Sequence, residues 1–145
     1  MSQIMNEWTE LIRWAGYLQL GVAVGSLAVP YLLQWRDELL SVRTLIKQVF
    51  WTYAAYIFCT NLFFAVLSIC LAPSLTDGSG LAVAICLFIT LYWGARLGIQ
   101  FLYYDKKGIP NGGIYRYGEW LLSLCFVFFT IVYGGAAFLC VWGTP

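Results

Sequence analysis

The sequence predicts an all-α membrane protein in which four transmembrane helices form one compact antiparallel bundle, preceded by a short interfacial N-terminal helix. Hydrophobic residues make up 61% of the 145 residues and charged residues only 10%, whereas a soluble domain carries about 25% charge because its surface faces water. Four apolar stretches each reach the ~20 residues that cross a bilayer as a helix. Short polar connections separate them, so we expect one domain that spans residues 1–145.

The first span is predicted over residues 14–35, with a tryptophan at each end as an interface anchor. Before it, residues 1–13 carry apolar side chains at helical spacing, which favours a helix lying in the membrane interface and running into the span. Gly21 and Gly25 form a GxxxG pair, a pattern that permits close approach of two helices. This pair is therefore a predicted helix-packing surface.

The second span is predicted over residues 48–72 and ends where Pro73 interrupts the helical pattern. The preceding segment, residues 36–47, is the most polar of the chain, and we expect it to form a helical arm at the membrane surface. The second span also supplies candidate polar groups for a site inside the membrane. These are Tyr53, Tyr56, Thr60 and Asn61.

The third span is predicted over residues 81–104, and a helical projection separates it into two faces. The polar side chains of one face are Tyr92, Arg96, Gln100 and Tyr103. The other face carries a second GxxxG pair, Gly94 and Gly98. A helix in a simple four-helix bundle meets its two neighbours on adjacent flanks. Two nearly opposite faces therefore predict packing against something outside the bundle, either a second copy or a partner subunit.

The fourth span is predicted over residues 118–142, and Glu119 near its start is a membrane-proximal carboxylate on the predicted core face. The segments 36–47 and 105–117 hold three Lys or Arg residues each, whereas the connections on the opposite side hold only Arg13. Because short basic loops stay in the cytoplasm, we expect both termini on the non-cytoplasmic side of a cell (inner) membrane.

Composition argues against several classes of function. The chain has no histidine, which removes the commonest haem and zinc ligand and the commonest general base at neutral pH. Its five cysteines lie in apolar runs without Cys-x-x-Cys spacing, and its net charge of +1 provides no basic surface for nucleic acid. We therefore predict no metal, cofactor or nucleic-acid partner. An enzyme using Glu119, Asp105 and the tyrosines has no support in their spacing.

Arg96 is the residue that most needs an explanation, because a guanidinium in the middle of a span costs at least a few kcal/mol. The Cα–Cβ bond tilts toward the N-terminus of a helix, so the side chain is expected to point away from the nearer, cytoplasmic headgroups. Two interpretations stay open. In the structural interpretation, Arg96 donates hydrogen bonds to tyrosines, backbone carbonyls, Asn61 or Glu119. In the functional interpretation, an acid-poor pocket around Arg96 receives a lipid headgroup, fatty acid or quinone, since the guanidinium fork matches carboxylate and phosphate.

The leading functional prediction is an interaction or accessory subunit without catalytic chemistry, which packs in the lipid bilayer against itself or a larger membrane complex. The alternative is binding or transport of a lipophilic anion in a pocket centred on Arg96. The residues predicted for that pocket are Arg96, Gln100, Tyr92, Tyr103, Tyr53, Tyr56, Thr60, Asn61 and Glu119. Both predictions depend on the third span.

Overall fold

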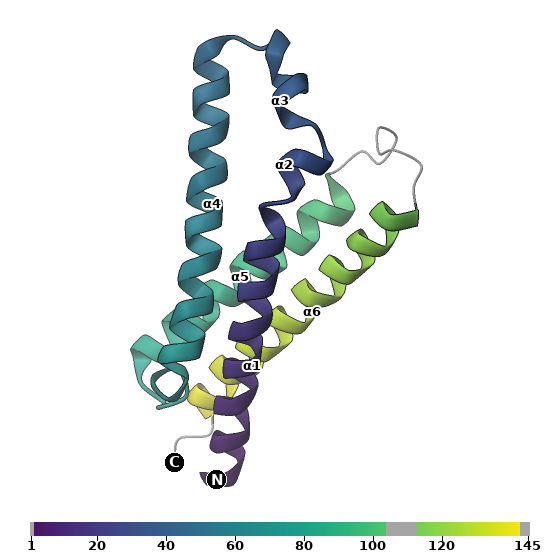
Figure 1. The fold of residues 1–145 in the computed structure, drawn as a ribbon. Helices are drawn as coiled ribbons and strands as arrows, with labels where there is room; N and C mark the ends of the chain where they lie inside the picture. The colour runs from purple at the N-terminus through teal and green to yellow at the C-terminus, as the bar shows by residue number, and fades with distance from the viewer. Residues whose placement is uncertain (1, 104–112, 143–145) are drawn as a thin grey trace.

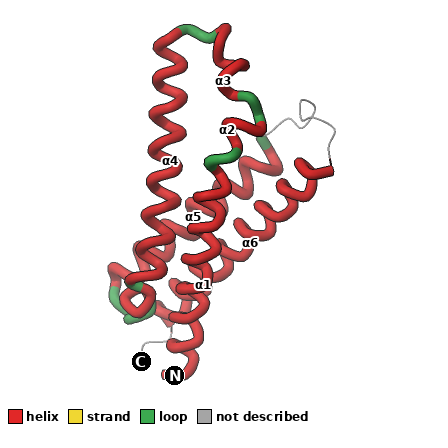
Figure 2. The backbone as a smooth tube through the Cα atoms, in the orientation of Figure 1, coloured by secondary structure: helices red, strands yellow, loops and turns green. Residues whose placement is uncertain are grey.

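The structure is a computed structural model that describes residues 2–103 and 113–142. This part of the chain is helical and contains no strand (Figure 2). Four of its helices are long and apolar enough to cross a membrane, which confirms the predicted all-α class with four spans of membrane length. They are α1 (Ser2–Ser26), α4 (Thr44–Cys70), α5 (Gly80–Leu102) and α6 (Gly113–Trp142). The predicted loop residues 105–112, Asp105 among them, lie outside the described residues.

The N-terminal segment and the first span form one continuous helix, as expected for a segment that runs into the span. Helix α1 starts at Ser2, and the apolar stretch of spanning length covers Gln3–Leu32, which begins earlier than the predicted 14–35. No proline or glycine interrupts residues 2–15, so nothing in the sequence stops the helix at the expected boundary.

The end of the predicted first span and the predicted polar arm, residues 36–47, form short pieces rather than continuous helices. They are α2 (Val29–Leu32), α3 (Trp35–Glu38) and the 3-10 turn η1 (Leu39–Ser41). Pro30 lies in the first turn of α2, and Gln34 adopts a left-handed backbone conformation with φ of 50°. Both features prevent a continuous helix. Helix α4 then begins at Thr44.

The connection between α4 and α5 follows turn chemistry that the sequence displays. Pro73 lies in the 3-10 turn η2 (Ala72–Leu75), and Gly78 supplies the positive φ of 77° that a side chain rarely adopts. The Ser79 hydroxyl accepts a hydrogen bond from the Ala82 amide at 3.1 Å, which caps the first turn of α5. The chain can therefore reverse within a few residues.

The long helices pack mainly in two pairs, α1 along α4 and α5 along α6, and α1 also contacts α6. Figure 1 shows the four helices converging at the end that carries η2 and diverging toward the end that carries α3 and the start of α4. Large buried side chains fill the region where the helices meet. They include Ile12, Phe64, Ile89, Trp93, Phe129 and Tyr133.

Two glycines that the sequence did not single out permit the closest helix contacts. A Cβ on Gly16 of α1 would lie 2.9 Å from Ser68 Cβ of α4, and one on Gly135 of α6 would overlap the indole of Trp8. The predicted packing glycines have more room. Thr130 Cγ2 would lie 3.8 Å from a Cβ on Gly94, and nothing lies within 4 Å of one on Gly21, Gly25 or Gly98. Contacts of these glycines with another chain stay a prediction.

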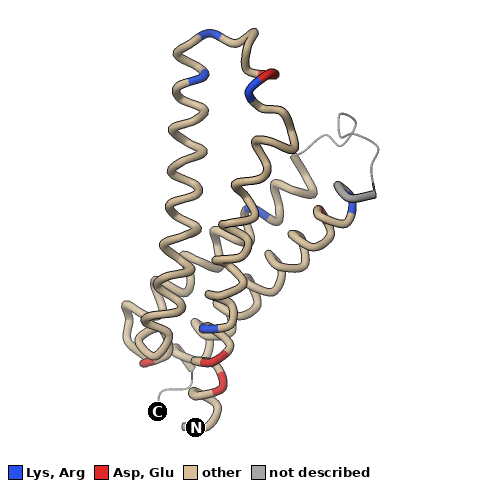
Figure 3. Tube along the Cα trace, viewed as in Figure 1, with Lys and Arg blue, Asp and Glu red and all other residues tan. Residues whose placement is uncertain are grey.

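Basic residues gather at one end of the described structure. Figure 3 shows Lys and Arg on α3, at the start of α4 and at the start of α6, all toward the end where the helices diverge. The acidic residues of α1 and of the α4–α5 connection lie at the opposite end. This is the charge distribution from which the orientation is predicted.

Candidate functional site

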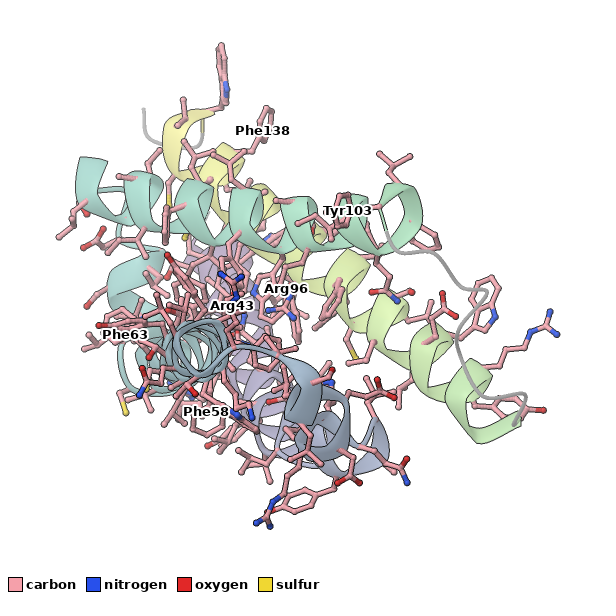
Figure 4. All side chains as sticks on the ribbon, turned by 90° about the horizontal axis from the view of Figure 1, so that it is seen from above. Arg43, Phe58, Phe63, Arg96, Tyr103 and Phe138 are labelled. Atoms are coloured by element: carbon pink, nitrogen blue, oxygen red, sulfur yellow. The ribbon has the colours of Figure 1, made fainter. Side chains whose placement is uncertain are left out.

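Arg96 lies partly exposed on α5, six residues before the end of the helix. Seen from above in Figure 4, it projects from the side of α5 that faces α4. Its Nη1 atom donates a hydrogen bond to the Tyr92 hydroxyl at 3.2 Å. Its guanidinium carbon lies 5.6 Å from the ring centroid of Phe126 on α6, and 5.9 and 6.0 Å from those of Tyr92 and Trp93. Aromatic rings at these distances stabilise a cation.

Tyr92 connects Arg96 to α4. Its hydroxyl donates to Asn61 Oδ1 at 2.7 Å, and Asn61 is buried at 4% exposure. Because a phenol has one proton, this donation leaves the oxygen lone pairs of Tyr92 to accept from Arg96. The three residues form a hydrogen-bonded chain from α4 to α5. The structure thus brings together three of the residues predicted for the pocket.

Among the described residues, Arg96 has more N–H donors than its surroundings have hydrogen-bond acceptors. A guanidinium has five N–H donors, and Arg96 uses one of them, toward Tyr92. Within residues 2–103 and 113–142, no carboxylate lies within 4 Å of Arg96, since the ion pair of this part of the chain joins Arg13 and Glu10 at 2.6 Å. The Trp93 ring beside Arg96 is 1% exposed, and its indole N–H also has no acceptor.

Gln100, one turn beyond Arg96, ties α5 to α6. Its Nε2 atom donates to Ser123 Oγ at 2.8 Å and to the Glu119 main-chain oxygen at 3.2 Å. The Ser123 hydroxyl in turn donates to that same oxygen at 2.8 Å. Glu119 therefore meets Gln100 through its backbone, and the salt bridge with Arg96 that the sequence left open is not formed. The amide of Gln100 acts here as a structural link between helices.

The remaining predicted residues lie further from the guanidinium contacts. Tyr53, Tyr56 and Tyr103 are 65%, 67% and 81% exposed, which places their rings at the surface of this chain. Thr60 donates within its own helix, to the Tyr56 carbonyl at 2.8 Å. Among the described residues, the rings beside the Arg96 guanidinium are those of Tyr92, Trp93 and Phe126, and not that of Tyr53. The part of Tyr53 and Tyr103 in a pocket stays a prediction.

A groove of about 590 Å³ runs between α4 and α5 and opens to the outside of the chain. Phe64 lines this groove, and its ring lies 5.1 Å from the ring of Tyr92, the hydrogen-bond partner of Arg96. Phe88, Tyr92 and Arg96 follow at intervals of four residues and so lie on one stripe of α5. The residues that line the groove include Tyr56, Thr60, Phe63, Phe64, Ala84 and Phe88.

A second polar cluster lies in the core between α1, α4 and α6. The hydroxyls of Ser68 and Tyr133, both fully buried, form a hydrogen bond. Gln19 of α1 is also fully buried near the Tyr133 hydroxyl, yet its amide forms no hydrogen bond of normal geometry. Ser68 additionally donates to the Phe64 carbonyl at 2.7 Å. The Ser68–Tyr133 hydrogen bond joins α4 to α6 beside α1, which suits a structural role.

Sequence reasoning missed two aromatic neighbours of the site. Phe88 could have been found, because it precedes Tyr92 and Arg96 at the same four-residue spacing. Phe126 could not, because its position over the guanidinium depends on how α6 lies against α5. Among the described residues, no three His, Cys, Asp or Glu side chains gather as a metal site.

Comparisons of the chain with protein-family models, with curated proteins and with solved structures find no match. The functional argument therefore depends on the side chains. Arg96, with unused donors among the described residues, lies two turns along α5 from Phe88 of the apolar groove, and its partner Tyr92 contacts Phe64 of the groove. Chemically, this arrangement can hold an anionic head group beside an apolar chain.

Proposed function

We propose that the protein binds a lipophilic anion inside the membrane, at Arg96. One observation carries the proposal, namely that Arg96 uses one of its five donors and has no carboxylate within 4 Å among the described residues. The rings of Tyr92, Trp93 and Phe126 stabilise the charge without occupying its N–H groups. The guanidinium is therefore held in place with most of its donors unused.

The unused donors, rather than the energy balance, favour a further partner. Placing arginine at the centre of a span costs about 2.5–3.5 kcal/mol on insertion scales, and Arg96 lies nearer to one end of α5, so this figure is an upper bound. A hydrogen bond between helices in a membrane contributes about 0.6 kcal/mol, and a cation over an aromatic face about 0.5–2 kcal/mol. These contacts can offset the cost, but among the described residues four N–H groups of Arg96 have no acceptor. A carboxylate or phosphate matches the fork of the guanidinium and accepts two of them at once.

The proposal includes the finer architecture expected from the sequence. We place α1, α4, α5 and α6 as an antiparallel bundle with the basic segments in the cytoplasm and both termini outside. The alternating course of the helices in Figure 1 and the basic residues at one end support this arrangement. Arg96 then lies six residues, or about 9 Å, below the cytoplasmic end of α5. An anion at this depth must be attached to an apolar body.

The test measures equilibrium binding of radiolabelled palmitate to the purified protein in nanodiscs of zwitterionic lipid, with palmityl alcohol as the uncharged competitor. Wild type should prefer palmitate, because a charge-assisted hydrogen bond contributes about 1.5–3 kcal/mol. Arg96→Gln should weaken palmitate binding tenfold or more, since 1.4 kcal/mol is a factor of ten. Arg96→Lys keeps the charge, should recover part of the affinity, and controls for loss of folding. Equal affinities in wild type and Arg96→Gln would refute the proposal.

A second candidate function, an interaction or accessory subunit, is favoured by the glycines of α1. Gly21 and Gly25 are exposed, one turn apart, with open space above both, so another helix could approach there. Gly25→Leu should then reduce crosslinking between copies, or recovery of a partner chain, whereas Val24→Leu on the same turn should not. A strictly monomeric protein in native nanodiscs, without any co-purified chain, would contradict this candidate.

A further inference from the structure

We infer, on the basis of the proposed function, that the ligand is a free long-chain carboxylate. Its head group would bind Arg96, and its single acyl chain would occupy the groove between α4 and α5. The groove and the arginine are independent observations. The volume of the groove depends on how α4 and α5 lie, whereas the positive charge belongs to the Arg96 side chain. Their positions two turns apart on one stripe of α5 suggest the class of ligand.

The groove and the guanidinium form one path along α5. Phe88 lines the groove, Tyr92 follows one turn later and Arg96 one further turn on, so the path covers eight residues, or about 12 Å. On α4, the ring of Phe64 lines the groove and lies 5.1 Å from Tyr92. One residue of the apolar groove therefore contacts Tyr92, the hydrogen-bond partner of Arg96.

The size of the groove matches a single long acyl chain. A water molecule takes about 30 Å³ in the liquid, and a methylene group is of similar size. The 590 Å³ of the groove therefore holds roughly twenty such groups. A single long acyl chain with its carboxylate has about that many non-hydrogen atoms. A phospholipid has two such chains, of which the groove would hold one, and the competition experiment below distinguishes it from a single-chain carboxylate.

The lining of the groove favours a purely apolar occupant. Phe63, Phe64 and Phe88 present aromatic rings, and no charged residue lines it. The Thr60 hydroxyl already donates to the carbonyl of Tyr56, so it does not require a partner from the ligand. Of these residues, only Arg96 can therefore bind the charged group of the ligand. A quinone head, which is neutral, would leave the positive charge uncompensated, whereas a carboxylate neutralises it.

The experiment separates the chain from the head group in the same nanodisc assay. Ala84 is exposed and lines the groove, so Ala84→Trp fills the path of the chain. Leu87 is exposed on the same helix but does not line the groove, which makes Leu87→Trp the matched control. Ala84→Trp should weaken palmitate binding at least tenfold and octanoate binding less than threefold. Leu87→Trp should change neither.

The competitors identify the ligand class. Unlabelled palmitate should displace the label at concentrations at least tenfold lower than dimyristoylphosphatidylglycerol or decylubiquinone. If either competitor displaces it as well as palmitate, the long-chain carboxylate is the wrong class. Ala84→Leu is a milder form of Ala84→Trp. If Arg96→Gln abolishes palmitate binding while both Ala84 variants leave it unchanged, the proposed anion site is supported, but the acyl chain does not lie in the groove. If wild type binds none of these probes, both proposals fail.

Discussion

Replacing Gly16 by alanine tests how closely α1 and α4 pack. The added Cβ would lie 2.9 Å from Ser68 Cβ and Ile69 Cγ1, and 3.1 Å from the Ala65 carbonyl oxygen. A Cβ atom and a backbone oxygen cannot rotate away, so the two helices must separate slightly or bend. The same residue of α4, Ser68, also bonds Tyr133 of α6. We therefore expect the substitution to loosen contacts among three helices.

The magnitude follows from comparison with a matched glycine. Overpacking a core by a methyl group costs about 1–3 kcal/mol. Gly21 lies in the same helix, but nothing lies within 4 Å of a Cβ added there. Both alanines gain the same helix propensity of about 0.5–1 kcal/mol. The difference in free energy of unfolding between the two variants therefore isolates the packing effect, and Gly16→Ala should be about 1–3 kcal/mol less stable than Gly21→Ala.

Reversible unfolding in mixed micelles of a mild detergent and sodium dodecyl sulfate, followed by tryptophan fluorescence, measures this difference. Wild type, Gly16→Ala and Gly21→Ala are compared under one set of conditions. Equal free energies of unfolding for the two variants would refute the close α1–α4 contact.

Three further predictions concern the core, the α4–α5 connection and the cysteines. Tyr133→Phe removes the buried bond to Ser68 and should lower the free energy of unfolding by about 0.6–1.7 kcal/mol; no change would contradict that bond. Hydrogen bonds from the Ser79 hydroxyl and amide lower the pKa of Asp77. They therefore stabilise the folded protein above the ordinary pKa of a carboxyl group, and this stabilisation is lost as the pH falls through the lowered pKa. Wild type should therefore lose more stability than Asp77→Asn on acidification below about pH 4, and parallel pH profiles would count against this. Of the described thiols, Cys70 is exposed at the end of α4 and should react with N-ethylmaleimide before unfolding, whereas Cys86, Cys125 and Cys140 are buried and should react only on unfolding. Reaction of these four thiols at one rate would contradict the packing of the buried three.

The sequence was sufficient to predict the number and nature of the spans. Length and hydropathy alone select the four long helices, because a lipid-facing helix must be apolar over its whole length. The boundary at residue 14 was less predictable, since polar residues at 1–13 continue the helical pattern without a stop signal. The breaks after Ser26 depend on Pro30 and on the left-handed Gln34, and of these only the proline can be read in the sequence.

The candidate site could be predicted in part. Helical spacing places Tyr92 one turn from Arg96, and apolar surroundings require a polar partner, which Asn61 provides through Tyr92. The groove could not be predicted, because it arises from the angle between α4 and α5. The closest helix approach also involves a different glycine from those in the GxxxG pairs. A glycine pattern shows where a backbone is accessible, but not which helix lies against it.

The central claim is that Arg96 holds an anion whose chain lies between α4 and α5. An experimental density map of the protein, extracted with its native lipids and imaged without added ligand, tests it most directly. We predict elongated non-protein density with one end within hydrogen-bonding distance of the Arg96 guanidinium and its length along Phe64 and Phe88. Occupation of the Arg96 donors by a carboxylate or carbonyl of a protein chain, with no lipid density in the groove, would contradict the claim.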